Sequence, residues 1–276
     1  KLLWRRLRDD EPHRFQLVLG PRRVGKTTAL YQTVRHLISD GTDPTRIWWL
    51  RLDHPLLLQE QLGDLVRAVI ESSGATDASP VFLMLDELVY TDRWDQWLKT
   101  FYDDRWPVRI AATSSATAAL RDRRLESGVG RWAEQHLTPY LFTEFLELVD
   151  AGKDAPVDRH LSESIRALPH GTRSDPDVTR WRRQFMLVGG FPELLTLPRD
   201  RPNDDDGTRL IESQQILRSD AVERAVYKDI PQSFGVDSPM MLERLLYVLA
   251  AQITGILSPS NICKDLGLSQ PRFDRY

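Results

Sequence analysis

Cysteine is nearly missing from this chain of 276 residues, in which Cys263 is the single example. An intramolecular disulfide is therefore excluded, which favours a reducing compartment such as the cytoplasm. Long hydrophobic runs are missing as well, because no stretch approaches the roughly 18 apolar residues of a membrane-spanning helix. Nothing resembles a signal peptide. We expect a cytoplasmic protein that does not engage a membrane.

A surplus of positive charge is also missing. The formal net charge is −3 and the sequence pI is near 6.1, so the composition does not indicate a general nucleic-acid binder. A local DNA-binding face stays open. What the chain does have is a hydrophobic fraction of 41%, enough for a sizeable core. Its length suggests two domains, at roughly 150 residues per domain.

The most informative stretch is GPRRVGKTT, which fits the pattern G-x-x-x-x-G-K-[ST] of a phosphate-binding loop. Apolar residues 15–19 before it predict a buried strand, and the apolar residues after it recur at helical spacing. The glycines let backbone N–H groups point at an anion, and the lysine can reach the outer phosphates. We therefore expect ATP to bind at Gly20, Pro21, Arg22, Arg23, Val24, Gly25, Lys26, Thr27 and Thr28.

A second stretch, VFLMLDE over residues 81–87, has the form of a Walker B segment, a buried strand that ends in two carboxylates. Asp86 would hold Mg²⁺ opposite the Thr27 hydroxyl. Glu87 would polarise the water that attacks the γ-phosphate, with Lys26 as its catalytic partner on the phosphate side. The competing interpretation is an ordinary strand followed by a solvated acidic turn.

Five short apolar runs alternate with helical patterns, which predicts an α/β fold with a parallel five-stranded sheet and helices on both faces. The runs are residues 14–19, 47–52, 81–85, 108–113 and 135–137. One strand separates the phosphate loop from the acidic strand in sequence. That order favours P-loop NTPases of the additional-strand type over GTPases. The helical stripe with Trp94 and Trp97 is predicted to lie in the core.

The fourth predicted strand ends in the polar run Thr113, Ser114 and Ser115. In such folds a polar residue at this strand end lies between the two nucleotide-binding motifs and senses the γ-phosphate. The sequence offers either Ser115 or Thr113 for this role. The alternative is a simple turn of small residues.

An ordered set of further motifs carries a resemblance to a known family. After GPRRVGKTT and LDE come TSSATAAL, VGRW, LTPYLFTEFLE, GGFPEL and SPSNICKDLGLSQPRFDRY. This order resembles the prokaryotic AAA-type ATPases related to the archaeal ATPase group, which carry a C-terminal winged helix. The resemblance implies a γ-phosphate contact by Arg131, in cis or across a subunit boundary of a homo-oligomer. It also implies that Pro192 packs near the adenine. The family usually has glycine where this chain has Ser114.

The composition divides the chain into three predicted parts. Residues 1–150 form the ATPase core, and residues 151–200 a lid or insertion with the GGFP element and a short helix around 161–168. Residues 201–276 form an all-α region after a linker at 199–207. Its end, with helices at 259–266 and 269–276 around Gly267, predicts a helix-turn-helix and leaves DNA open as a partner.

The pattern as a whole predicts an Mg²⁺-dependent ATPase that couples its nucleotide state to conformation or assembly. Two other interpretations stay open. One is a nucleotide-gated regulatory scaffold with little hydrolysis, and the other is a winged-helix DNA-binding regulator. No metal beyond Mg²⁺ is suggested by the sequence.

Overall fold

The computed structural model describes residues 2–9, 13–115, 130–148, 176–188, 190–195, 206–231, 236–252 and 258–274. The helix predicted around 161–168 and nearly all of the predicted linker at 199–207 lie outside these residues. Contacts divide the chain into two compact units. The first comprises residues 1–22, 26–137 and 220–276, and the second comprises residues 23–25 and 138–219.

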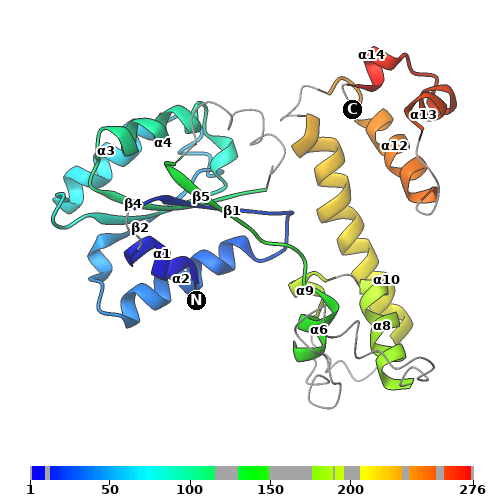
Figure 1. Ribbon diagram of the computed structural model, residues 1–276, viewed down its shortest axis with the longest axis horizontal. Helices are drawn as coiled ribbons and strands as arrows, with labels where there is room; N and C mark the ends of the chain where they lie inside the picture. The colour runs from blue at the N-terminus through cyan, green and yellow to red at the C-terminus, as the bar shows by residue number, and fades with distance from the viewer. Residues whose placement is uncertain are drawn as a thin grey trace. The chain divides into compact units, whose positions relative to one another are not determined.

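A five-stranded parallel sheet forms the centre of the first unit (Figure 1). Its strands follow the order β2-β3-β4-β1-β5, so β4 lies between β1 and β3. This inserted central strand is the additional-strand arrangement, and the predicted fold class is confirmed. The strands are β1 (Phe15–Leu19), β2 (Ile47–Arg51), β3 (Val81–Asp86), β4 (Val108–Ser114) and β5 (Trp132–His136).

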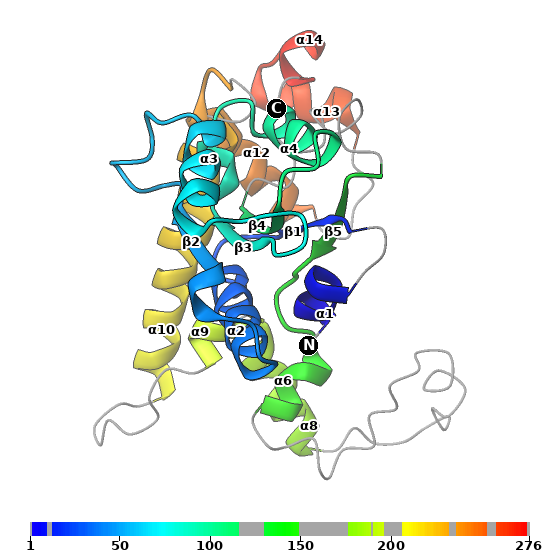
Figure 2. The same ribbon diagram turned by 90° about the vertical axis from the view of Figure 1, so that its left-hand side faces the viewer.

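Helices cover both faces of this sheet (Figures 1 and 2). One face packs against α3 (Leu62–Ser73) and α4 (Trp94–Asp103), which bring Val66, Leu98 and Phe101 to full burial against the strands. The opposite face packs against α1 (Leu2–Asp9) and α2 (Lys26–Ser39). Trp94 is 2% exposed and Trp97 packs against the same cluster, so their predicted core position is confirmed.

Short 3₁₀ turns connect several of these elements, at η1 (Pro44–Arg46) before β2 and at η2 (Leu88–Tyr90) after β3. The fifth strand is longer than the predicted 135–137, because Trp132 to Gln135 pair in register with residues Phe15 to Val18 of β1. The amphipathic helix α1 was missed at the sequence level, although Leu3 and Leu7 lie one helical turn apart and are both buried.

The rest of the described chain is helical. In the second unit lie α6 (Phe142–Leu148), α8 (Pro176–Val188), α9 (Pro192–Leu195) and α10 (Asp206–Ile216). After α10 the chain forms the π-helical segments η4 (Leu217–Glu223) and η5 (Ala225–Asp229). In the first unit follow α12 (Pro239–Ala251), α13 (Pro259–Leu266) and α14 (Gln270–Phe273). A helical C-terminal region is therefore present, and the predicted three-part division of the chain stays a prediction.

Candidate nucleotide site

The phosphate loop follows β1 at the carboxyl edge of the sheet and leads directly into α2, which begins at Lys26. The loop turns sharply, since Gly25 has a φ of 94° and Arg23 a φ of 63°. A left-handed conformation at these positions lets consecutive backbone N–H groups face one concave side, as an anion requires. Val24 is buried and anchors the loop, whereas Pro21 and Thr28 are exposed. The loop and the helix N-terminus thus form an anion-binding arrangement.

Lys26 is 5% exposed, and its ammonium lies inside the loop rather than in solvent. Its Nζ donates hydrogen bonds to the carbonyl oxygens of Gly20 at 3.0 Å and of Pro21 at 2.8 Å. Burial lowers the pKa of Lys26, and Arg22 lowers it further, while Glu87, Asp86 and Asp229 act in the opposite direction. The lysine is therefore a buried group held by two carbonyl oxygens of the loop, with acidic groups within electrostatic range.

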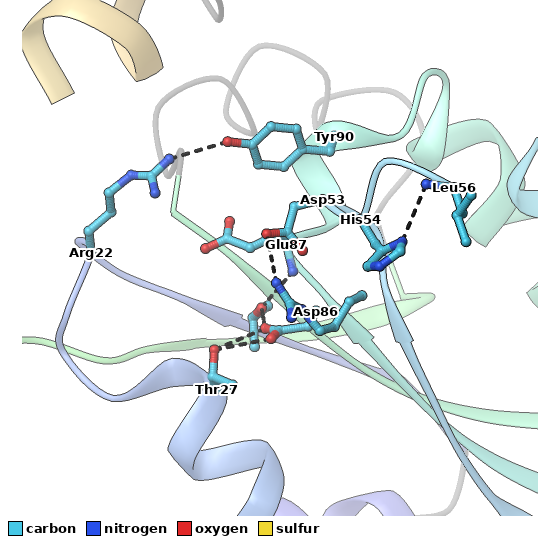
Figure 3. Close-up of polar contacts among 10 residues, drawn as sticks. Arg22, Thr27, Asp53, His54, Leu56, Asp86, Glu87 and Tyr90 are labelled. Carbon is cyan, nitrogen blue, oxygen red and sulfur yellow. Dashed lines mark hydrogen bonds and ion pairs between the residues drawn. The ribbon is translucent and has the colours of Figure 1, made fainter. Parts of the chain in front are cut away.

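Thr27 and Asp86 face each other across the sheet edge (Figure 3). The Thr27 hydroxyl donates to the Asp86 carboxylate, with distances of 3.2 Å to Oδ1 and 3.1 Å to Oδ2. Asp86 is the last residue of β3 and is 5% exposed. The parallel sheet produces this meeting, because the carboxyl ends of β1 and β3 lie at the same edge with β4 between them.

Glu87 lies one residue beyond the strand in a left-handed conformation, with a φ of 59°. A non-glycine residue in this region is strained, and such strain concentrates at functional sites. Thr113 holds the turn, because its hydroxyl donates to Asp86 Oδ1 at 2.5 Å and accepts the Glu87 backbone N–H at 2.9 Å. Ser115 donates to Glu87 Oε2 at 3.0 Å.

The sequence offered Thr113 and Ser115 as alternatives, and the structure brings both to the acidic pair with different partners. Thr113 contacts Asp86 and the backbone of Glu87, whereas Ser115 contacts the Glu87 carboxylate. Between them, the Ser114 hydroxyl is buried and has no hydrogen-bond partner among the described residues. This is the position where the resembling family usually has glycine.

The residues present fit a magnesium ion. A hydroxyl and a carboxylate oxygen set is the kind that Mg²⁺ prefers, and Mg²⁺ in nucleotide sites uses one or two protein oxygens with water and phosphate. The facing Thr27 and Asp86 provide such a pair. In the part of the chain that the structure describes, no three His, Cys, Asp or Glu side chains gather as a metal cluster.

Arg131 lies away from the loop, immediately before β5, at the amino edge of the sheet. Its backbone carbonyl accepts the N–H of Phe15, the first residue of β1. Its guanidinium forms a two-pronged pair with Asp103 at the end of α4, at 2.7 and 3.0 Å, which lowers the pKa of that carboxyl. The five residues of β1 separate this edge from the phosphate loop, about 16 Å at the usual rise per residue. Within one chain, Arg131 and the loop lie at opposite edges.

The second unit contains the GGFP element, of which Gly189 lies outside the described residues. Gly190 approaches Tyr140 closely, since its carbonyl accepts the Tyr140 N–H at 2.6 Å. A Cβ at Gly190 would lie 2.1 Å from the Tyr140 carbonyl oxygen, so only glycine fits. Pro192 begins α9, and the next residue, Glu193, forms an ion pair with Arg23. In the same unit, an aromatic cluster is formed by Phe142, Phe145, Trp181 and Phe185.

One contact of the loop was not foreseen from the sequence. The Arg22 guanidinium pairs with Asp229 in η5, a residue 207 positions further along the chain. No local pattern could have indicated it, because both residues are ordinary charged positions in their own segments.

Two family models match parts of this chain. Residues 12–146 match the family model described as AAA domain, and residues 179–276 match a model described as a domain of unknown function (DUF8612). Two uncharacterized proteins of Methanocaldococcus jannaschii are similar over most of the chain. MJ1637 is 25% identical over 245 residues, which are 85% of this chain and 48% of that protein. MJ1544 is 22% identical over 257 residues, which are 92% of this chain and 51% of that protein. The chain thus spans about half the length of these relatives.

Three solved structures are similar at low identity. The Aeropyrum pernix ORC1 protein in complex with DNA has a TM-score of 0.43 at 14% identity, covering 99% of this chain and 78% of that one. The Thermotoga maritima RuvB branch migration motor has a TM-score of 0.39 at 16% identity, covering 98% and 80%. AMPPCP-bound DnaA from Aquifex aeolicus has a TM-score of 0.33 at 14% identity, covering 94% and 88%. At such scores the fold assignment rests on the sheet itself. Among the described helices, none has the length and apolar character that crossing a membrane requires.

Proposed function

We propose that the protein binds ATP with Mg²⁺ at the phosphate loop and hydrolyses it, because residues 12–146 match the family model described as AAA domain. The observation that carries this proposal is the meeting of Thr27, Asp86 and Glu87 at one edge of the sheet. In this account the nucleotide state is coupled to conformation or assembly.

In this proposal each residue of the site has its own role. The backbone N–H groups of the loop and the ammonium of Lys26 bind the outer phosphates. The Thr27 hydroxyl and the Asp86 carboxylate hold Mg²⁺, which supplies positive charge beside the β- and γ-phosphate oxygens. Pro192 packs near the adenine, as the family resemblance implies.

Glu87 orients and polarises the attacking water. The strained backbone fixes where its carboxylate lies, and the hydrogen bond from Ser115 fixes how the carboxylate is turned. Thr113 ties Glu87 to the metal-binding carboxylate, so both acids move together. Thr113 and Ser115 therefore share the role of linking β4 to the γ-phosphate position.

Measurement of phosphate release by the full chain tests the proposal, with wild type compared with Glu87→Gln. Glutamine keeps the shape but cannot accept the water's proton, and general-base help contributes roughly 10²–10⁴-fold. We expect turnover to fall by about that factor while ATP still binds. Glu71→Gln, at an exposed position of α3, is the matched control and should hydrolyse ATP like wild type.

The same assay separates the main rival. In a nucleotide-gated scaffold with little hydrolysis, wild type and Glu87→Gln would bind ATP equally and both would release phosphate at the same very low rate. Equal rates would therefore overturn the hydrolytic half of the proposal.

Arg131 acts across a subunit boundary in this account, because its own loop lies at the opposite edge of the sheet. A positive charge supplied by a neighbour can raise phosphoryl-transfer rates by about 10³–10⁵-fold. Mixing Arg131→Ala with Lys26→Ala subunits should then restore part of the lost turnover, since a mixed interface contains one intact loop and one intact arginine. A mixture that stays inactive would remove Arg131 and the homo-oligomer from the proposal.

DNA is a second proposed partner, through α13 and α14. These helices are joined at Gly267, which has a φ of 65°, and Gln270 and Arg272 are exposed on α14. A winged helix at this position, the division at residues 150 and 200, and a cytoplasmic location remain predictions. Turnover measured with and without duplex DNA tests the partner, and stimulation is the expected result.

A further inference from the structure

The unforeseen pair of Arg22 and Asp229 is a partly buried, two-pronged ion pair. Arg22 Nε donates to Asp229 Oδ2 at 2.6 Å, and Nη2 donates to Oδ1 at 2.7 Å. The two side chains are only 18% and 14% exposed. Parallel hydrogen bonds of this kind are among the strongest and most directional in proteins. A carboxylate of the C-terminal region thus holds the third residue of the phosphate loop.

Tyr90, in the turn that follows β3, contacts both Arg22 of the loop and Lys228 of η5. Arg22 Nη2 also lies 3.4 Å from the hydroxyl of Tyr90, and Figure 3 shows Arg22 directed toward Tyr90 and away from Thr27. The Lys228 ammonium lies 5.8 Å from the centre of the Tyr90 ring. Tyr90 ends η2, the turn that begins right after Glu87. Two consecutive residues of η5, Lys228 and Asp229, therefore contact the segments that follow both β1 and β3.

The backbone of η5 has the wide turn of a π-helix, a feature that is rare and frequent at functional sites. The electrostatics point the same way. Asp229 raises the pKa of the buried Lys26 ammonium, whereas Arg22 lowers it. The Asp229 carboxylate therefore lies within electrostatic range of the group that would hold the outer phosphates.

Arg22 is thus held by one anion, Asp229, within the loop that would bind a second anion, the triphosphate. A triphosphate brings several negative charges to the loop, where it competes with Asp229 for Arg22 and repels the Asp229 carboxylate. We propose that the Arg22–Asp229 pair couples nucleotide binding to the contact between η5 and the phosphate loop. Triphosphate binding breaks the pair and releases η5 from the loop. Coupling between two binding events is reciprocal, so losing Asp229 tightens triphosphate binding. This inference rests on the proposed function of the loop.

Titration of ATP–Mg²⁺ into Asp229→Asn and wild type tests the coupling. The asparagine has nearly the same shape but no charge to compete, so we expect the dissociation constant to fall about five-fold or more, within the usual range of such couplings. A purely structural role for Asp229 predicts the reverse, since a damaged loop would bind more weakly. Asp265→Asn, at an exposed position of α13, is the matched control and should bind like wild type.

Hydrogen exchange measured on wild type gives a second readout. Because wild type carries no substitution, a folding defect cannot cause the result. Saturating ATP–Mg²⁺ should protect amides of residues 20–28 and speed exchange of residues 225–229. Lys26→Ala with the same ATP should not change residues 225–229. Unchanged or slower exchange in η5 while the loop becomes protected would overturn the coupling, as would equal or weaker ATP binding by Asp229→Asn. If wild type does not bind ATP at all, the proposed function itself fails.

Discussion

The sheet and the C-terminal helices of the first unit differ in how closely their apolar side chains pack. In the sheet and its covering helices, Leu83, Leu98 and Phe101 are completely buried in one continuous cluster. Among the described residues of the C-terminal helices the buried apolar side chains are fewer, and in α12 they are less enclosed, with Leu242 and Leu245 each 8% exposed. Large apolar side chains of α12 also reach solvent, with Met240 59% and Tyr247 57% exposed.

This difference in packing indicates that the sheet is the rigid part of the first unit and that the C-terminal helices open more easily. Close packing leaves few alternative positions, so the sheet can hold Asp86 and Glu87 within hydrogen-bond reach of Thr27 and Ser115. The helical region relies more on separate polar contacts, such as the hydrogen bond from Tyr227 to Glu243 at 2.6 Å. Segments with thin cores open locally at low free-energy cost, as a region that responds to nucleotide must.

The largest expected effect tests this contrast in stability directly. Leu98→Ala removes a fully buried side chain, so we expect a loss of about 2–5 kcal/mol in the free energy of unfolding. Leu245→Ala makes the same chemical change in a more open environment, and its cost should be about 2 kcal/mol or less. Urea unfolding followed by tryptophan fluorescence measures both. Equal losses of unfolding free energy in the two variants would contradict the difference in packing between the sheet and the C-terminal helices.

The next effect concerns binding at the rigid edge. Lys26→Ala removes a charged donor, and hydrogen bonds to charged groups contribute about 1.5–3 kcal/mol each. ATP affinity should therefore fall roughly 10- to 150-fold, as measured by titration. Lys99→Ala removes the same charge from an exposed position of α4 and serves as the control. Similar affinities for the two variants would show that the loop is not the binding site.

A smaller effect extends the contrast to the second unit. Gly190→Ala would push a methyl group into the backbone of Tyr140, which cannot rotate away, and overpacking of this kind costs about 1–3 kcal/mol. Because Pro192 begins α9 two residues later and is proposed to pack near the adenine, ATP affinity should fall as well. A thermal scan and a titration on the same sample check both halves, and unchanged stability would contradict the close approach of Gly190 and Tyr140.

Much of the sheet region could be predicted from the sequence. Four of the five strands match their apolar runs closely, because a buried parallel strand is a continuous apolar segment. The fifth was predicted to begin too late, since Glu134 interrupts the apolar pattern after Trp132 and Ala133 on an edge strand. The phosphate loop and the acidic pair could be found because local sequence alone determines their chemistry.

The remaining features depend on contacts between distant residues. Nothing near Arg22 or Asp229 in the sequence indicates the other, and their pairing exists only once both segments have folded. The separate partners of Thr113 and Ser115 follow from how β4 lies beside β3, which the sequence did not resolve. The position of Arg131 opposite the loop follows from strand direction, and could have been deduced once a parallel sheet was expected.

The most direct measurement of the central claim is the magnesium dependence of ATP affinity for the full chain. Wild type should bind ATP more tightly with excess Mg²⁺ than with EDTA, because Thr27 and Asp86 hold the ion beside the phosphates. Asp86→Asn should still bind ATP through Lys26 and the loop but lose most of the gain from Mg²⁺. If wild type binds no ATP with Mg²⁺, or if Asp86→Asn keeps the full gain, the sheet edge is not an ATP–Mg²⁺ site.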